Sequence, residues 1–347
     1  MSLPAKYIEI KAKHALGRGA SAPVTVHLEL LVGCNMKCKT CDQWRRYSDN
    51  PDYKKTELTT DEWIKLADEL GAMGVNAVGI TGGEPLLHPG LFEIIKSLKR
   101  NKIITHVNTN GTLNSDENVR RLVESGVDSV TVSIDHLGEE HDKTRGVPGT
   151  YSRAVEMVKK LKAAGIKRVG IGALLMGQET AQIENLAKLA EELGVEISFG
   201  GFDLGLLKQD VAEKKTAYQK FAENIDTVLK LRKTHKSIIV LPDYLQYMRR
   251  QLEKEETIKW CYAGFGVCIV RSNGDVQPCY QFPSAGNLHN KSFKEIWNSA
   301  EMRELRKRIK GGCKGCFANC TIEPSIILND PFAAFNFYRF KLSKIKK

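Results

Sequence analysis

Nine cysteines are the residues of this chain whose type and spacing are best suited to chemistry. They fall into two groups, and short spacings between cysteines are typical of metal and iron–sulfur ligands. Three thiolates within the segment CNMKCKTC can hold three corners of a four-iron cluster and leave one iron without a protein ligand. A zinc ion there would need a fourth ligand from elsewhere, for example His27 or Asp42. The first group consists of Cys34, Cys38 and Cys41.

The second group lies between residues 261 and 320 and has enough thiolates for a four-ligand site. Two of its cysteines flank an SNGD turn and two form a CxxC motif, so either zinc or an iron–sulfur cluster fits. Two further cysteines, Cys268 and Cys320, are spare. Each is either a small buried hydrophobe, a replacement ligand, or a candidate catalytic donor of a proton or hydrogen atom. The four expected ligands are Cys261, Cys279, Cys313 and Cys316.

Six short runs rich in β-branched residues alternate with segments of helical periodicity in the first 202 residues. The segment 59–74 is the clearest helix, because its apolar residues form one stripe and Thr59 with Glu62 makes a capping box. Strand–helix units in a row predict a parallel sheet. The expected strands are residues 24–32, 77–81, 103–109, 129–135, 168–175 and 196–202.

The strand patterns favour an open barrel over a doubly wound sheet. In the first strand Val26 and Leu28 share one face, whereas His27 and Glu29 share the other. A doubly wound sheet is apolar on both faces, so one polar face indicates a solvated lumen. We therefore predict an α/β protein with a partial, TIM-like (β/α)6 barrel. Glu29 is a candidate catalytic residue in the lumen, although a structural hydrogen-bond network is the commoner arrangement there.

Four motifs stand at the ends of the first four expected strands, where parallel α/β proteins place their chemistry. They are the cysteine segment, Thr81–Pro85 (TGGEP), Asn108–Gly111 and Ser133–Asp135, with Arg145 ten residues further on. In this arrangement residues 24–205 resemble the radical S-adenosylmethionine (SAM) superfamily, with its CxxxCxxC cluster loop and GGEP motif. Enzymes of this superfamily can carry an iron–sulfur extension after the barrel, and the second cysteine group stands in that position.

The resemblance implies a reaction that begins with SAM. The open iron chelates the amino and carboxylate groups of SAM, and an electron from the cluster splits the sulfonium to release a 5′-deoxyadenosyl radical. That radical removes hydrogen from an unactivated C–H bond of the substrate. One position departs from the family pattern, because Thr40 stands before the third cysteine, where an aromatic residue near the adenine is common.

The resemblance also implies which residues bind SAM. The carbonyls of the glycine pair would accept from the methionine ammonium, with the glutamate alongside. Asn108 and Ser133 would bond the ribose or the carboxylate, and Arg145 would pair with the carboxylate as a fork. Asp135 belongs to the set, although an aspartate at a strand end often caps a helix. The expected SAM-binding residues are Gly82, Gly83, Glu84, Asn108, Ser133, Asp135 and Arg145.

The second cysteine group resembles the SPASM and Twitch extensions of the same superfamily. The resemblance lies in segments 270–279, 286–287 and 292–297. A full SPASM domain carries seven cysteines and two clusters, whereas six cysteines are present here and position 322 is Ile. The Twitch pattern, with one auxiliary [4Fe-4S] cluster, therefore fits better. Such a cluster either accepts an electron from the substrate radical or binds substrate at an open iron, and four thiolates favour the first.

The composition is that of a folded protein and limits its partners. The chain has 347 residues, of which 42% are hydrophobic and 27% charged, and a net charge of +11. It has no apolar run long enough to cross a membrane and no signal peptide, so we expect a cytoplasmic protein. The charge suits an acidic flavodoxin or ferredoxin as electron donor. A nucleic-acid partner is not expected, because the basic residues lack interleaved aromatics.

The expected organisation has five parts. The C-terminal segment combines aromatic residues with lysines, and we expect it either to dock over the barrel mouth or to contact a membrane peripherally. The parts are an N-terminal extension (1–23), the radical SAM core (24–205), a helical connector (206–256), the Twitch- or SPASM-like auxiliary cluster domain (257–322) and the basic aromatic tail (323–347).

The sequence thus predicts a radical SAM enzyme whose reaction begins with hydrogen abstraction and ends in oxidation or bond formation. Its cofactors would be SAM, a SAM-binding [4Fe-4S] cluster and an auxiliary [4Fe-4S] cluster. The substrate could be a peptide, sugar, tetrapyrrole, lipid or cofactor precursor. The alternative is a non-catalytic iron–sulfur electron carrier or a zinc-stabilised binding protein.

Overall fold

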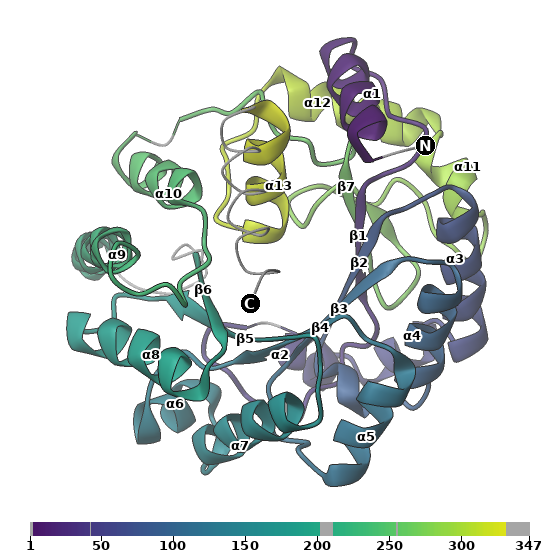
Figure 1. Cartoon of the computed structure of the whole chain (residues 1–347). Coiled ribbons are helices and arrows are strands. Elements are labelled where there is room, and N and C mark those ends of the chain that lie inside the picture. Colours follow the sequence, from purple (N-terminus) through teal and green to yellow (C-terminus); the bar gives the residue numbers. More distant parts are fainter. Residues whose placement is uncertain (1–2, 42, 202–210, 255, 331–347) are drawn as a thin grey trace.

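A computed structural model describes residues 3–41, 43–201, 211–254 and 256–330 of the chain. One sheet, with strand order β6-β5-β4-β3-β2-β1-β7-β8, curves through the molecule with helices on its outside (Figure 1). The first six strands are parallel and lie side by side in chain order. In a doubly wound sheet the order of the strands along the chain reverses at one point, whereas β1 to β6 follow one another without a reversal. The predicted partial barrel is therefore confirmed. The strands are β1 (Thr25–Glu29), β2 (Ala77–Thr81), β3 (Ile104–Thr109), β4 (Ser129–Ser133), β5 (Arg168–Leu175) and β6 (Glu196–Gly201).

Amphipathic helices cover the convex side of the sheet. The first of them, α3, begins with the expected capping box: the Thr59 hydroxyl accepts from the Glu62 amide, and the Glu62 carboxylate accepts from the Thr59 amide. Its apolar stripe, which includes Trp63, is buried against the sheet. The helices are α3 (Thr60–Ala72), α4 (Leu91–Arg100), α5 (Asp116–Ser125), α6 (Gly138–Arg145), α7 (Thr150–Ala163) and α8 (Thr180–Leu193).

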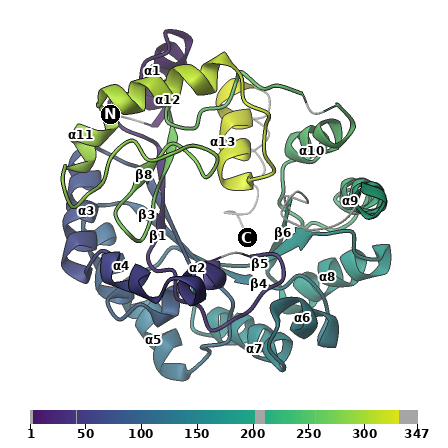
Figure 2. The ribbon, with the colours of Figure 1, turned by 180° about the vertical axis from the view of Figure 1, so that it is seen from behind.

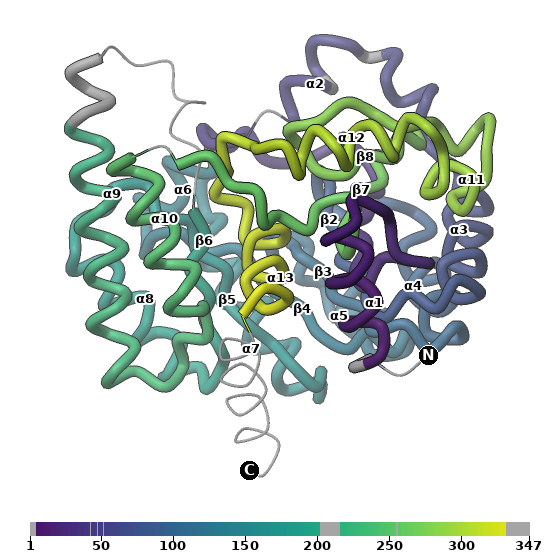
Figure 3. The backbone as a smooth tube through the Cα atoms, turned by 90° about the horizontal axis from the view of Figure 1, so that it is seen from above, coloured from purple at the N-terminus to yellow at the C-terminus, as the bar shows by residue number. Residues whose placement is uncertain are grey.

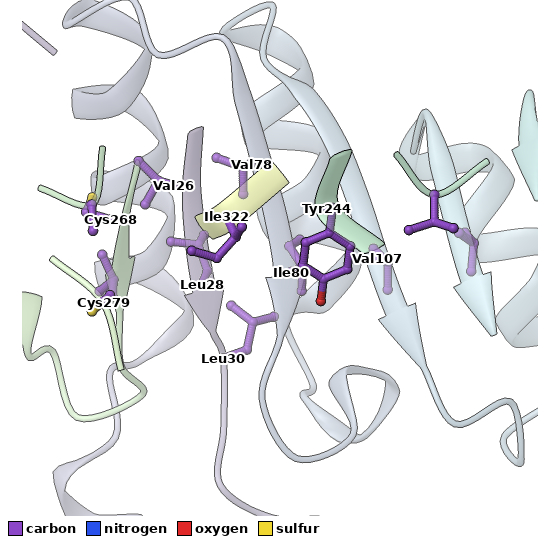
Figure 4. Packing of buried hydrophobic residues seen from close by; sticks show 14 of the residues in the cluster. Val26, Leu28, Leu30, Val78, Ile80, Val107, Tyr244, Cys268, Cys279 and Ile322 are labelled. Atoms are coloured by element: carbon purple, nitrogen blue, oxygen red, sulfur yellow. The ribbon is translucent and has the colours of Figure 1, made fainter. Parts of the chain in front are cut away.

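The core lies between the helices and the apolar face of the strands. Val26 and Leu28 of β1 are fully buried beside Val78 and Ile80 of β2 (Figure 4). Burying an aliphatic side chain of this size contributes about 1.5–3 kcal/mol. Strand β1 ends at Glu29, earlier than expected, because the next residues turn toward β2 to begin the loop with the first cysteines.

The second cysteine group does not form a separate body, because its first strand joins the barrel sheet. Strand β7 (Val267–Val270) pairs in parallel with β1, and Thr25 lies opposite Val267. Strand β8 (Val276–Gln277) is antiparallel to β7. The sheet therefore continues past β1 into the segment that carries the second group. This segment also contains α11 (Phe293–Trp297), α12 (Ala300–Gly311) and α13 (Asn319–Asn329).

Helix α13 lies across the opening between the two edges of the curved sheet, as views from both sides show (Figures 1 and 2). Helices α9 (Val211–Leu231) and α10 (Pro242–Lys254) lie in the segment expected to be a connector. Helix α9 packs against α8 and α10 packs against α9, so the two continue the outer wall (Figure 3). Helix α10 also packs against α13. The N-terminal helix α1 (Leu3–Ala15) touches α13 from the other side.

Three short helices complete the described fold: α2 (Gln43–Asp49), η1 (Pro51–Thr56) and η2 (Pro85–Leu87). Within the described ranges, none of the helices combines the length and the apolar character needed to cross a membrane. Asp42, one of the alternative zinc ligands, lies outside the described residues, and so does the tail segment 331–347 on which the membrane-contact prediction rests. The five-part division of the chain stays a prediction.

Candidate active site

The loop with the first three cysteines is held on one side by the end of β2. The amide of Gly83 donates to the carbonyl of Leu31 at 2.7 Å, and the amide of Glu84 donates to the carbonyl of Gly33 at 3.0 Å. A Cβ atom at Gly83 would lie 1.9 Å from the Gly33 oxygen, so no larger residue fits without moving the loop. The glycines of the TGGEP motif therefore allow two backbones to pass each other at contact distance.

The same loop is held on its other side by the end of α6. The amide of Lys37 donates to the carbonyl of Arg145 at 3.1 Å, and that of Lys39 donates to the carbonyl of Thr144 at 3.0 Å. Gly146, which ends α6 with a φ of 72°, has the oxygen of Lys37 only 2.6 Å from where its Cβ would stand. The loop is thus held between two backbone segments, which places its three thiols at the carboxyl ends of the strands.

The structure brings the residues predicted for the first site around one cavity of about 730 Å³. It lies in the lumen of the barrel and runs from the cysteine loop toward the opposite ends of the strands, where Arg168 and Glu196 stand. A cavity of this size is typical of small-molecule sites. Its lining includes Cys34, Cys38, Cys41, Gly82, Gly83, Glu84, Asn108, Ser133, Asp135 and Arg145.

Glu84 uses its carboxylate to join the ends of two strands. It accepts from the Thr109 hydroxyl at 2.7 Å, from the Asn110 amide at 2.7 Å and from the Leu86 amide at 3.1 Å. Burial raises the pKa of the carboxyl, and these three bonds oppose that rise. The bonds give Glu84 a structural role, and its expected contact with the methionine ammonium stays a prediction.

Arg145 and Asp135 form a buried ion pair beside the cysteine loop. Nη2 of Arg145 lies 2.6 Å from Oδ2 of Asp135, and Nη1 lies 3.9 Å from Sγ of Cys38. Burial by itself lowers the pKa of Arg145, but attraction by Asp135 and Cys38 outweighs it and raises the pKa. The sequence predicts a separate contact with SAM for Arg145 and for Asp135, and it does not reveal their ion pair. Opposite charges at a strand end and in the last turn of the next short helix were the available signal.

A chain of hydrogen bonds along the lumen contains a histidine that sequence reasoning also missed. Nδ1 of His106 lies 2.7 Å from the Ser129 hydroxyl, and its Nε2 lies 3.1 Å from Oδ1 of Asn108. His106 and Asn108 share one face of β3 because alternate residues of a strand point to the same side. The alternation of β3 alone would have placed His106 in the lumen.

The CxxC segment of the second group is held by two tyrosines of α10. The Tyr247 hydroxyl donates to the carbonyl of Cys316 at 3.2 Å and accepts from its amide at 3.3 Å. The Tyr244 hydroxyl donates to the carbonyl of Phe317 and accepts from the amide of Gly201, at the end of β6, at 3.0 Å. The segment after the CxxC motif is therefore tied both to α10 and to the barrel.

Thiols of the second group are near enough to one another to repel each other when they ionise. Burial raises the pKa of Cys261 to about 11 and that of Cys279 to about 12, and repulsion by neighbouring thiolates raises each further. Burial and repulsion by neighbouring thiolates also raise the pKa of Cys316. Thiols in such a place ionise when a cationic metal cluster binds them, with release of protons. The neighbours that act on one another are Cys261, Cys279, Cys313, Cys316 and Cys320.

The two spare cysteines have different surroundings. Cys268 is fully buried in β7, opposite Val26, and the charge that acts on its thiol is Arg306. It therefore lies apart from the five thiols that act on one another. Cys320 stands among them, and Glu29 is one of the charges that raise the pKa of its thiol after burial itself.

Glu29, the candidate catalytic carboxylate, links the two cysteine regions. It is 3% exposed, accepts from Nε2 of Gln43 at 2.8 Å and lies 2.7 Å from Nη1 of Arg271. Gln43 follows the first cysteine loop, and Arg271 follows β7. The structure thus places Glu29 in a buried ion pair, the structural alternative considered from the sequence, and its catalytic role stays a prediction.

His27, on the same face of β1, meets the start of α13. Burial lowers its pKa to about 4, and a hydrogen bond to the backbone of Cys320 opposes the fall. Pro324 lies inside α13 and has no amide to donate to the Cys320 carbonyl one turn before it. The carbonyl left without its helical donor is therefore available to the histidine ring.

The donor sets fit iron–sulfur ligation. As the side chains stand, the described ranges hold no group of three or more His, Cys, Asp or Glu that could bind a metal ion. Both groups nevertheless offer thiols alone, and thiolates are the ligands of iron–sulfur clusters. At the first group the buried Nε of Arg145 has no hydrogen-bond partner within the described residues, so a donor remains for an anionic ligand.

Comparison with known proteins agrees with this geometry. Residues 28–190 match the radical SAM superfamily and residues 261–321 match the SPASM iron–sulfur cluster-binding domain. An AdoMet-dependent heme synthase of Methanosarcina barkeri is 31% identical, over 85% of this chain and 89% of that protein. A pre-heme d1 synthase of Dinoroseobacter shibae is 27% identical, over 92% of this chain and 86% of that protein.

Solved structures show the same fold. Streptococcus suis SuiB bound to the precursor peptide SuiA aligns with a TM-score of 0.67 at 20% identity, over 91% of this chain and 76% of that chain. Both cysteine groups lie inside the segments that the family models match. The chain therefore belongs to the radical SAM superfamily, as an enzyme that binds SAM at a [4Fe-4S] cluster and carries an auxiliary cluster in a SPASM-type domain.

Proposed function

We propose that this enzyme oxidises an aliphatic side chain of a carboxylate-bearing tetrapyrrole. One observation carries the proposal: the cavity lined by the first three cysteines is also lined by residues 317–319, which directly follow Cys316. A substrate in the cavity therefore lies between the two cysteine groups. When bound, SAM and the clusters supply a 5′-deoxyadenosyl radical and an electron acceptor. The substrate would lose one hydrogen atom to that radical, one electron to that acceptor and one proton to solvent, which would convert a carbon–carbon single bond of the side chain into a double bond.

One auxiliary [4Fe-4S] cluster is held, in this proposal, by Cys261, Cys279, Cys313 and Cys316. Their support is the CxxC spacing of Cys313 and Cys316 and the two hydrogen bonds by which Tyr247 holds the backbone of Cys316. Four thiolates leave no open iron, so the cluster serves as an electron acceptor and not as a substrate site. Cys320 stands next to this set and is not one of the four ligands in this proposal.

In this proposal the protein's own residues hold the substrate in a polar lumen. The hydrogen-bond chain of Ser129, His106 and Asn108 lines the cavity and is able to orient a polar substituent. Side chains on rigid strands hold such groups in place with little reorganisation. A net charge of +11 favours an anionic substrate, and propionate-type side chains make a tetrapyrrole anionic.

The choice of a tetrapyrrole rests on the two relatives. The heme synthase of M. barkeri and the pre-heme d1 synthase of D. shibae both have names that refer to hemes, and both align along most of this chain. The cavity volume of about 730 Å³ is compatible with a large planar ligand that shares the lumen with SAM.

The test uses the full chain, reconstituted with iron and sulfide under anaerobic conditions. An iron porphyrin with propionate side chains is added, with the methyl ester of the same porphyrin as control. We expect a change in the porphyrin absorbance, porphyrin-dependent formation of 5′-deoxyadenosine and a loss of mass from the porphyrin, all absent with the ester. Modification of a peptide in place of the porphyrin would overturn the substrate class.

We also infer that an acidic flavodoxin or ferredoxin delivers the electron to the SAM-binding cluster. The support is the positive net charge, which steers acidic partners toward the surface.

A further inference from the structure

The guanidinium of Arg145 stands between the first cysteine loop and the end of β4. Its Nη1 lies 3.9 Å from Sγ of Cys38, a hydrogen-bond distance for sulfur, and its Nη2 lies 2.6 Å from Oδ2 of Asp135. The Arg145 side chain is 14% exposed and that of Asp135 is 1% exposed. A positive charge is thus in contact with one cluster-ligating sulfur, and its other terminal nitrogen is paired with a buried carboxylate.

The position of this charge is fixed by contacts on both partners. Oδ1 of Asp135 accepts from the amide of Leu174 on β5 at 3.0 Å, and the Asp135 amide donates to Nδ1 of His141 at 3.2 Å. The backbone of Arg145 accepts from the amide of Lys37, in the cysteine loop itself, at 3.1 Å. Movement of the guanidinium away from Cys38 would therefore also break its ion pair with Asp135, whose carboxylate is held by the amide of Leu174 on β5.

A charge held in this way acts on the electron affinity of the cluster. Reduction adds one negative charge to the cluster, and a nearby cation in a buried site stabilises that charge much more than it would in water. Hydrogen bonds and charges at ligand sulfurs are recognised determinants of the reduction potential of iron–sulfur clusters. We propose that Arg145 raises the reduction potential of the SAM-binding cluster through its contact with Cys38, and that Asp135 limits the rise.

The proposal makes Arg145 a positioning residue for electron entry, in place of the carboxylate fork that the family resemblance implies. It rests on the assignment of the SAM-binding cluster to the first three cysteines and not on the tetrapyrrole. Failure of the substrate assignment therefore leaves it standing.

The two partners are predicted to shift the potential in opposite directions. R145M removes the cation and lowers the midpoint potential, whereas D135N removes the counterion and raises it. R145K keeps the charge and stays near the wild type. The double variant R145M/D135N lies between R145M and the wild type, because Arg145 acts on Cys38 more strongly than Asp135 does.

The experiment is a redox titration of the reconstituted, SAM-free full-length chain, followed by the electron paramagnetic resonance signal of the reduced cluster. Each variant is built on C313A as well, so that the signal of the SAM-binding cluster stands alone. We expect R145M and D135N each to change the ratio of reduced to oxidised cluster at a fixed potential by about tenfold, or about 59 mV for one electron.

R168M is the matched control. Arg168 lines the same cavity and is paired with Glu196 at 2.7 Å, so its loss removes the same charge with a similar partner. It begins β5, six residues before Leu174, and so lies about 20 Å further along the strand. Its midpoint potential is expected to equal that of the wild type.

Two outcomes overturn the proposal. The first is an unchanged midpoint in both R145M and D135N, or a shift of both in one direction, which a merely structural role would give. The second is an unchanged midpoint in SAM-free R145M together with weaker SAM binding, which would make Arg145 the fork for the SAM carboxylate. If R145M fails to retain its cluster, D135N still decides the sign.

Discussion

The two cysteine regions are held in place by different means. The first loop is clamped by backbone atoms of β2 and α6, through contacts so close that glycine is required at Gly83. The second region is held by the side chains of Tyr244 and Tyr247, which reach it from a helix some seventy residues earlier in the chain. Close contact between backbones requires glycines, which are visible as a motif in the sequence. Contacts made by the side chains of distant tyrosines produce no such motif. The first site should therefore be the more rigid and the more sensitive to a single added carbon.

The largest expected effect separates the two regions by function. C34A is expected to lose the formation of 5′-deoxyadenosine, because it removes a ligand of the SAM-binding cluster. C313A is expected to retain SAM cleavage and to lose product, because the substrate electron then has no acceptor. The measurements are iron content, 5′-deoxyadenosine and product in single turnover. Normal product formation by C313A would refute the separation.

The second prediction tests the backbone clamp. G83A places a Cβ 1.9 Å from the Gly33 carbonyl oxygen, and the resulting shift should cost about 1–3 kcal/mol in the free energy of unfolding and reduce iron at the first site. The matched control is G311A, since a Cβ there meets nothing within 4 Å. Gly311 is the last residue of α12 and has room for a Cβ, so this change should stabilise the protein by about 0.4–1 kcal/mol. Urea unfolding of the cluster-free chains measures both, and equal effects would contradict the clamp.

The third prediction tests the side-chain clamp. Y247F removes a hydroxyl that both donates to and accepts from the backbone of Cys316, and should cost about 0.5–1.5 kcal/mol. The auxiliary cluster should then be lost faster to a chelator, while the SAM-binding cluster is lost at the wild-type rate. Y218F, in the neighbouring helix α9, is the control. The prediction is wrong if both clusters of Y247F decay faster together.

The smallest effect concerns electron delivery to the first region. With an acidic flavodoxin as donor, the initial rate of SAM cleavage should fall as salt is raised from about 50 to 200 mM, because salt screens the attraction between the surfaces. With dithionite as donor the rate should change little. A salt response of equal size with both donors would rule out electrostatic steering.

The sequence allowed the barrel to be predicted because its information is local. The six expected strands agree with β1 to β6 within a few residues, since alternation of apolar and polar residues is a property of each strand by itself. The cysteine loop, Gly82 and Gly83 were predictable for the same reason. Strand β7 was not predicted, because its four residues are all buried and show no alternation.

Pairing between distant residues accounts for what the sequence did not show. Arg145 and Asp135 were each expected to contact SAM, and only the fold reveals that they meet each other at 2.6 Å. Glu29 was expected in the lumen, and only the fold reveals that Arg271, from 242 positions away, meets its carboxylate. In each case a charge that looked available in the sequence has a protein partner in the buried site, as buried charges generally do.

The central claim is that two separate clusters serve one cavity. Its most direct test is the electron paramagnetic resonance spectrum of the reduced, reconstituted full-length chain before and after addition of SAM. We predict two cluster signals, of which SAM alters one, and in C313A a single signal that SAM still alters. A single cluster signal in the wild type, or two signals that both stay unchanged when SAM is added, would contradict the presence of two clusters at one cavity.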